Sequence, residues 1–148
     1  MKTTNDMKVS FAGHSINEGF ARVSAAAFFA QLDPTAEEIS DIKTAVSEAV
    51  TNCIVHAYRD DVGKIEMTAK ILSNDEVYIK IRDGGCGIED IKKAMEPTFT
   101  TDTAGERAGL GFAVMDTFMD KLRVYSKPGK GTTVVMKKKI KSRKSKND

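Results

Sequence analysis

Two runs of alternating apolar residues, joined by a short polar turn, constrain the fold of this chain most strongly. The turn is Ser73-Asn74-Asp75, and apolar positions alternate with polar ones on both sides of it: Ile65, Met67, Ala69 and Ile71 before it, Val77, Ile79 and Ile81 after it. A period of two gives a strand one apolar face, and a short polar turn joins two such strands into a hairpin. The pattern therefore predicts an antiparallel hairpin whose apolar face covers a core.

A strand and two amphipathic helices are predicted before this hairpin. Val9 and Phe11 indicate a first strand, after which Ser15 and Glu18 have the spacing of a capping box and predict a helix to about residue 32. Pro34 is expected at the first position of a second, longer helix. Its apolar stripe repeats at three- and four-residue steps, and the helix continues to about residue 57: Ile39, Ile42, Val46, Ala49, Val50 and Cys53.

The second half of the chain adds a glycine cluster, further helices and a second hairpin. A short helix is expected over 89–95, a stretch without periodicity over 97–108, and a third main helix over 109–119. A closing hairpin turns around 127–131, with apolar positions at Leu122, Val124, Val134 and Met136. Strands combined with amphipathic helices predict an α/β (α+β) two-layer sandwich, with a mixed, mostly antiparallel sheet and the helices on one of its faces.

Length and composition favour one globular domain. The chain has 148 residues, 41% of them hydrophobic, so residues 1–140 are expected to form a single domain and 141–148 a disordered basic tail. No apolar run reaches the roughly 18 residues of a membrane span, and the first residues lack the apolar stretch of a secretion signal. We therefore expect a cytoplasmic protein with no membrane contact. Cys53 and Cys86 have no neighbours at metal-site spacing and are expected to be free thiols.

The charged residues nearly balance but are unevenly placed. The chain has 23 Lys and Arg against 21 Asp and Glu, and seven of the bases lie within 137–148: Lys137, Lys138, Lys139, Lys141, Arg143, Lys144 and Lys146. The remaining chain is mildly acidic, so no direct contact with nucleic acid is expected from the domain as a whole. A nucleic-acid binder that acts through its basic tail stays as an alternative, and its binding would fall steeply with salt.

Glu48 and Asn52 are the first candidates for chemistry. They lie one turn apart on the second predicted helix and project away from its apolar stripe. An ionised Glu can accept a proton from a hydroxyl group or from water, and an Asn carbonyl oxygen suits Mg²⁺, which keeps most of its shell as water and phosphate oxygens. An exposed polar helix face is the alternative interpretation.

Two glycine-rich segments are the next candidates. Asp83-Gly84-Gly85-Cys86-Gly87 ends a predicted strand, and its carboxylate could accept a hydrogen bond from an amino group such as that of adenine; a tight turn is the alternative. Segment 105–111 contains Arg107 and ends where a helix begins, so its backbone N–H groups could bind an anion. The preceding unpatterned stretch is long enough for a mobile lid and is rich in threonine: Thr98, Thr100, Thr101 and Thr103.

Together these segments resemble the ATP-binding domains of the GHKL superfamily, which gyrases, heat-shock chaperones, histidine kinases and mismatch-repair ATPases share. Segment 48–52 is similar to the N-box, 83–87 to the first glycine box and 105–111 to the second. Gly131-Thr132-Thr133 resembles the Gly-Thr element near the last strand of these domains. Over nearly its whole length the chain is similar to the small anti-sigma kinases of sporulation, most clearly at 18–23, 31–35 and 42–52.

The resemblance implies a role for each matching position. Asn52 would hold Mg²⁺ and Asp83 would bind the adenine amino group, while Gly85 and Gly87 would admit the base and Thr132 would support it. Glu48 would be the catalytic base toward the serine hydroxyl of a protein substrate. The phosphates would be surrounded by residues of the lid and the second glycine box: Thr101, Arg107, Gly109, Leu110 and Gly111.

The resemblance also implies an anti-sigma factor with enzyme activity. Such a protein would bind and inhibit a sporulation sigma factor, and it would phosphorylate the antagonist, an anti-anti-sigma protein, on serine. It would act as a serine/threonine kinase with Mg-ATP and would change partners with the ATP or ADP state. Two alternatives remain at this point. One is an ATPase of the same fold in which Glu48 activates water, and the other is a binding module that uses the nucleotide only as a structural ligand.

The first predicted helix carries apolar residues on two faces. We assign one stripe to the core: Ile16, Phe20, Val23, Ala27 and Ala30. Ala25 and Phe29 fall on another side, beside Arg22, and are expected to form a surface for a partner or a twin subunit unless a loop covers Phe29. The resemblance implies that this region contributes to a homodimer and to contacts with both protein partners, and we place Arg22 in the shared surface.

Overall fold

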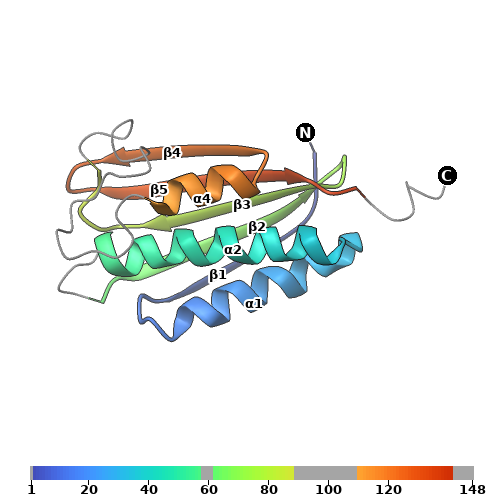
Figure 1. Ribbon diagram of the computed structural model, residues 1–148. Helices are drawn as coiled ribbons and strands as arrows, with labels where there is room; N and C mark the ends of the chain where they lie inside the picture. The colour runs from blue at the N-terminus through green and yellow to red at the C-terminus, as the bar shows by residue number, and fades with distance from the viewer. Residues whose placement is uncertain (1, 58–61, 89–109, 142–148) are drawn as a thin grey trace.

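A five-stranded sheet forms the base of the fold (Figure 1). The computed structural model describes residues 2–57, 62–88 and 110–141. Its strands are β1 (Thr3–Ala12), β2 (Lys64–Leu72), β3 (Glu76–Asp83), β4 (Lys121–Lys127) and β5 (Gly131–Lys139), in the order β1-β2-β3-β5-β4. Every neighbouring pair of these strands is antiparallel. Both predicted hairpins are therefore confirmed, and the mostly antiparallel sheet is confirmed as well.

Helices cover one face of this sheet, as predicted (Figure 1). They are α1 (Asn17–Phe29), which continues as a 3₁₀ turn, η1 (Ala30–Leu32); α2 (Ala36–Asn52), which continues as a π-helical segment, η2 (Cys53–Ala57); and α4 (Leu110–Phe118). Helix α2 packs between α1 and α4. No helix in the described part of the chain is long and apolar enough to cross a membrane. The helix expected over 89–95, the stretch 97–108 and residues 142–148 lie outside the described residues.

Both predicted helix starts differ from the observed ones. Ser15 and Glu18 form no capping box: α1 starts after Ile16 without a side-chain cap, and the Glu18 carboxylate pairs with Arg22 at 3.1 Å. Helix α2 starts after Thr35 and not at Pro34. Thr35 Oγ1 accepts from the Glu38 N–H at 3.1 Å, and the Glu38 carboxylate accepts from the Thr35 N–H at 2.8 Å. This reciprocal pair satisfies two backbone donors, which a proline cannot do.

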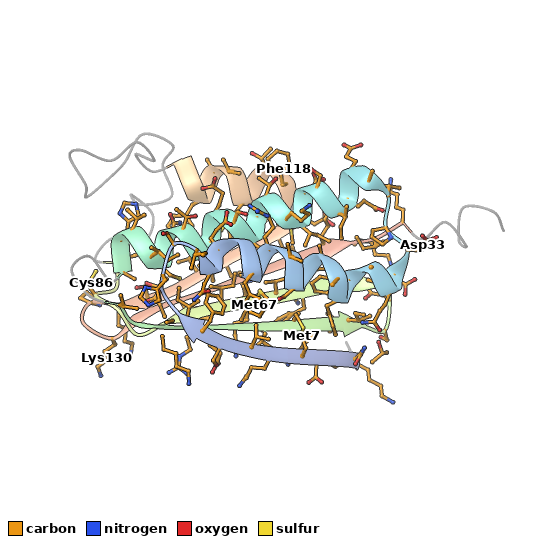
Figure 2. All side chains as sticks on the ribbon, turned by 90° about the horizontal axis from the view of Figure 1, so that it is seen from below. Met7, Asp33, Met67, Cys86, Phe118 and Lys130 are labelled. Atoms are coloured by element: carbon orange, nitrogen blue, oxygen red, sulfur yellow. The ribbon has the colours of Figure 1, made fainter. Side chains whose placement is uncertain are left out.

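The core lies between the sheet and the helices. The alternation along β3 buries Val77, Ile79 and Ile81, and α2 contributes the stripe that its sequence predicted, with Ile42 and Val46 fully buried. Met67 of β2 is fully buried and lies between the two layers in Figure 2. The other face of the sheet carries no helix among the described residues.

Helix α1 buries the face opposite to the predicted one. Ala21, Ala25 and Phe29 are completely buried, so the expectation that Ala25 and Phe29 form a partner surface is wrong. The stripe that we assigned to the core is exposed: Ile16, Phe20, Val23, Ala27 and Ala30. The small side chains of Ala21 and Ala25 fit the narrow space where α1 packs on α2 and the sheet, which the bulkier residues could not do without moving the helix.

Candidate functional site

Several segments that are distant in sequence meet at one end of the molecule. The end of α2 with η2, the loop after β3, the start of α4 and the turn between β4 and β5 all lie at the left end in Figure 1. Cys86 of the loop and Lys130 of the turn mark the same end in Figure 2. The predicted N-box, the first glycine box and the Gly-Thr element therefore converge, as their assignment to one site requires.

Asp83 is the most enclosed charged residue of this region. Only 5% of its surface is exposed, and its Oδ1 accepts from the Gly85 N–H at 2.9 Å and from the Thr132 N–H at 3.2 Å. The Cys53 thiol donates a third hydrogen bond to the carboxylate. Because a carboxylate has about four lone-pair directions, these donors leave one acceptor position. That position fits the exocyclic amino group that the sequence assigned to Asp83.

Burial controls the protonation of this pair. It raises the pKa of Asp83 above its ordinary value, and the hydrogen bonds from Gly85, Cys53 and Thr132 oppose part of that increase. Burial also raises the pKa of Cys53, and the negative charge of Asp83 adds to the effect. Cys53 therefore stays a protonated donor beneath the carboxylate. Its position directly after Asn52 was the only sequence signal for this role, because its place in the apolar stripe indicated a simple core residue.

The glycines of the first box allow close packing of protein backbone. A Cβ atom on Gly85 would collide with the Ala57 carbonyl oxygen, and one on Gly87 would collide with the Lys127 carbonyl oxygen. Gly87 also has a positive φ of 77°. Protein packing thus already requires glycine at both positions. Their additional role in admitting a base stays a prediction.

The π-helical end of α2 anchors the loop through its carbonyl groups. The Cys86 N–H donates to the Ala57 carbonyl at 3.1 Å, and the Cys86 thiol donates to the His56 carbonyl at 3.3 Å. A helix end leaves carbonyl groups without partners in the helix, and π-helical turns occur often at functional sites. The loop supplies the missing donors, so the position of Asp83 is tied to the end of α2.

Ser126 on β4 is a site residue that sequence reasoning missed. Its Oγ accepts from the Ile88 N–H at 2.8 Å and lies 2.8 Å from Thr132 Oγ1. It also donates to the Gly131 carbonyl at 3.0 Å. Thr132 is therefore held by its side chain as well as by its bond to Asp83. The alternation along β4 contained a signal, since Ser126 continues the inward positions of Leu122 and Val124 with a polar residue.

Asn52 meets the start of α4. A Cβ atom on Gly111 would lie 2.9 Å from Asn52 Oδ1, so the second glycine box and the N-box are in contact. Glu48 lies one helical turn before Asn52, and both side chains are partly exposed on the side of α2 away from its buried stripe. The described residues contain no group of three His, Cys, Asp or Glu side chains that could hold a metal ion. A cation at Asn52 would therefore depend on phosphate oxygens and water, which suits Mg²⁺.

The remaining predicted residues separate into two groups. Thr101, Arg107 and Gly109 lie outside the described residues, and Leu110 is described only as the first residue of α4. Arg22 belongs to the surface where α1 meets α2. Its Nη1 donates to Glu18 Oε1 at 3.1 Å and to Ser47 Oγ at 3.5 Å. Its part in partner binding stays a prediction.

The chain matches one family model and is similar to curated proteins over most of its length. Residues 17–138 match the family model of the histidine kinase-like ATPase domain. An anti-sigma F factor of Caldanaerobacter subterraneus subsp. tengcongensis is 59% identical over 140 residues, which cover 95% of this chain and 97% of that protein. An anti-sigma F factor of Clostridium perfringens strain SM101 is 54% identical over 136 residues, which cover 92% of this chain and 97% of that protein.

Solved structures share the fold at much lower identity. The RsbU and RsbW domains of a Mycobacterium tuberculosis protein align with a TM-score of 0.68 at 20% identity, covering 94% of this chain and 33% of that one. A blue-light activated histidine kinase of Erythrobacter litoralis aligns with a TM-score of 0.60 at 22% identity, covering 83% of this chain and 42% of that one. At these identities the likeness concerns the fold alone. It agrees with the predicted GHKL sandwich.

Proposed function

This chain belongs to the histidine kinase-like ATPase family, within which it is an anti-sigma factor, and we propose from that premise that it is a serine/threonine kinase acting on a protein. The proposed substrate is a serine of an anti-anti-sigma antagonist, and the proposed second partner is a sporulation sigma factor that the protein binds and inhibits in the cytoplasm. Nucleotide binding and phosphotransfer are properties of the family. The protein substrate, the serine acceptor and Mg²⁺ are the proposal.

The contact between Asn52 and Gly111 carries the proposal. It brings the start of α4, whose first N–H groups have no helical partners, to the Asn amide at the end of α2. Phosphate groups at this helix start would lie beside Asn52. Glu48 lies one turn before Asn52 on the same face of α2. Asp83 provides an acceptor for adenine at the same end of the molecule. The residues present therefore fit a purine nucleotide with its phosphates directed toward α2.

The proposed reaction transfers the terminal phosphoryl group of ATP. The serine oxygen of the antagonist bonds to the γ-phosphorus while the bond to the oxygen bridging the β- and γ-phosphates breaks, and ADP leaves. Glu48 accepts the proton of the serine hydroxyl. Mg²⁺, when bound by Asn52 and the phosphates, neutralises charge on the transferred group. Positioning and charge neutralisation dominate this chemistry, so one carboxylate is a sufficient base.

A transfer assay tests this proposal. The protein is mixed with γ-labelled ATP, Mg²⁺ and the purified antagonist, and label is expected on an antagonist serine. Glu48→Gln should lower the transfer rate by about 100-fold or more while ATP affinity is kept. Glu37→Gln, the same substitution at an exposed position in the first turn of α2, should leave the rate unchanged. Wild-type transfer by Glu48→Gln would refute the role of Glu48.

The two alternatives give different results in the same assay. An ATPase would release labelled free phosphate at the same rate with or without the antagonist. A binding module would consume no ATP and would still bind the sigma factor. Neither result is expected.

We place homodimer formation on the exposed stripe of α1. Ile16, Phe20 and Val23 are 83%, 52% and 59% exposed, and Ala27 and Ala30 extend the stripe. The spacing of these five residues alternates between four and three, which is the spacing of a coiled-coil seam, and two copies of one seam are complementary to each other.

Arg22 lies on the same helix and is our candidate for the partner surface. Unchanged binding of both protein partners by Arg22→Glu would refute that assignment.

A further inference from the structure

The face of the sheet that the helices leave open concentrates positive charge. We call it the open sheet face and define it by the side chains that alternate with the buried ones, such as Tyr78, Lys80 and Arg82 on β3. In Figure 2, long side chains with nitrogen ends project from the sheet on the side away from the helices. The strand registers place these basic residues on it: Lys8, Lys64, Lys70, Lys80, Arg82, Lys121, Arg123, Lys127, Lys137 and Lys139. None of them is buried.

Few acidic residues oppose this charge. Asp6, Glu66 and Glu76 are the acidic side chains that the same registers place on the open sheet face, and Glu66 forms an ion pair with Lys8 at 3.6 Å. Most acidic residues of the described chain instead lie in the helical layer and its connections: Glu18, Asp33, Glu37, Glu38, Asp41, Glu48, Asp116 and Asp120. Although positive and negative charges nearly balance along the sequence, one face of the folded molecule is therefore basic.

Two tyrosines lie among the basic side chains. Tyr78 stands on central strand β3, directly between Lys70 and Lys137 of the neighbouring strands, and their ammonium groups lie 5.3 and 6.0 Å from its ring centre. Tyr125 stands on edge strand β4 and is 57% exposed. Flat ring surfaces between cations are the combination with which proteins bind single-stranded nucleic acid, because bases stack on the rings while phosphates contact Lys and Arg.

We propose that the open sheet face binds single-stranded nucleic acid without strong sequence preference. The strand would cross β3, β5 and β4, with phosphates near Lys80, Arg82 and Arg123 and with a base on Tyr125. A duplex is a poorer fit, because its base faces are stacked and cannot reach a tyrosine. An anionic membrane is a poorer fit as well, because among the described residues Val135 is the one aliphatic side chain in the middle of this face, and Leu72 at its edge is buried. This proposal replaces the expectation that overall charge gave, and it is independent of the kinase activity.

Fluorescence anisotropy tests the proposal. The full-length protein is titrated into a labelled single-stranded 20-mer at 50 mM salt, with excess Mg-ADP present so that binding at the nucleotide site does not contribute. Binding is expected, and contact with three phosphates would weaken it by about 20-fold between 50 and 200 mM salt. A duplex of the same sequence and a polyglutamate peptide are run in parallel. Equal or tighter binding of either competitor would overturn the assignment to single strands.

Matched variants locate the binding. Lys80→Glu/Arg82→Glu should lower the affinity by about tenfold or more, because two phosphate contacts become repulsive. Lys43→Glu/Lys141→Glu changes the net charge equally on the helical side, since Lys43 lies on α2 and the Lys141 N–H donates to the Glu38 carboxylate of that helix, and it should have a much smaller effect. Tyr125→Ser should weaken binding by about fivefold or more at unchanged net charge. The basic tail is present in every variant, so an equal loss in both double variants, or no loss in either, would refute the proposal.

Discussion

Gly111 and Asn52 are in such close contact that no side chain fits between them. A Cβ atom on Gly111 would lie 2.9 Å from Asn52 Oδ1 and 3.0 Å from Asn52 Nδ2, which is closer than non-bonded carbon atoms approach either group. The contact joins the end of α2 to the start of α4. The orientation of the Asn52 amide and the position of the α4 N-terminus are therefore determined together.

Gly111→Ala is expected to weaken nucleotide binding without unfolding the protein. The added methyl group must displace the Asn52 amide, and loss of one ligand to a charged group lowers affinity by about tenfold. Titration of a fluorescent ATP analogue with and without Mg²⁺ measures the effect. The increase in nucleotide affinity that Mg²⁺ causes should be smaller in the variant than in the wild type. Gly19→Ala is the control: its Cβ would meet only Arg22 Nη2 at 3.7 Å, so it should stabilise α1 by about 0.5–1 kcal/mol and leave affinity unchanged. Unchanged Mg²⁺ stimulation in Gly111→Ala would contradict the assignment of Asn52.

Ser126→Ala is expected to loosen the loop after β3. The change removes the acceptor of the Ile88 N–H and the side-chain partner of Thr132, at a cost of about 1–2 kcal/mol in the free energy of unfolding. ATP affinity should fall as well, because Thr132 and Asp83 lose support. Urea unfolding and ATP titration measure the two effects. Ser10→Ala, at an exposed position of β1, should change neither by more than about 0.5 kcal/mol. Equal behaviour of the two variants would contradict the role of Ser126.

The sheet and most of the candidate site could be predicted from sequence, because period-two alternation and glycine-flanked polar residues are local signals. The alternation around 73–75 and 127–131 predicted both hairpins, and the pairing of Asp83 with Thr132 follows from the register of β3 and β5. The contact of Asn52 with Gly111 required tertiary structure, although both residues were selected beforehand. Ser126 was missed because a serine has no distinctive motif.

The orientation of α1 could not be predicted because its sequence contains two apolar stripes. Hydrophobicity alone favours burial of Ile16, Phe20 and Val23 over burial of two alanines. The close approach of α1 to α2 favours small side chains, and this steric requirement arises only after the helices pack. An apolar stripe of this size that stays exposed on a helix is typical of a contact surface.

Asp83 should make the stability of the protein depend on pH in a defined direction. Burial raises its pKa in the folded state above the ordinary value of 3.8, so the folded protein holds this proton to higher pH than the unfolded chain does. The contribution of Asp83 to the free energy of unfolding therefore declines as pH rises from about 3.8 through the raised pKa and is constant above it. Urea unfolding of wild type and Asp83→Asn across this range measures the free energy of unfolding of each protein. As pH rises, the value for the wild type should fall relative to the value for Asp83→Asn. The opposite slope would mean that the hydrogen bonds lower the pKa of Asp83 by more than burial raises it.

Asp83→Asn should also weaken ATP binding at neutral pH. The amide has one acceptor oxygen in place of two, and that oxygen is already required by the Gly85 and Thr132 N–H groups. A loss of about tenfold or more in affinity is expected, as for a hydrogen bond to a charged group. Equal ATP affinity in wild type and Asp83→Asn would show that adenine binds elsewhere.

Phe20→Glu should convert a dimer into a monomer if the exposed stripe of α1 is the subunit interface. Phe20 is the second residue of the stripe, and its ring touches that of Phe11 edge-on with 6.1 Å between the ring centres. Because 52% of Phe20 is still exposed, much of the side chain stays available to a second copy. A carboxylate there would be buried against apolar residues in the dimer, at a cost of several kcal/mol. Sedimentation velocity at micromolar concentration measures the change in mass, and circular dichroism checks the fold. Phe118→Glu makes the same change at a 36% exposed position of α4 and should remain dimeric. A monomeric wild type, or a Phe20→Glu variant that stays dimeric, would move the interface away from this helix.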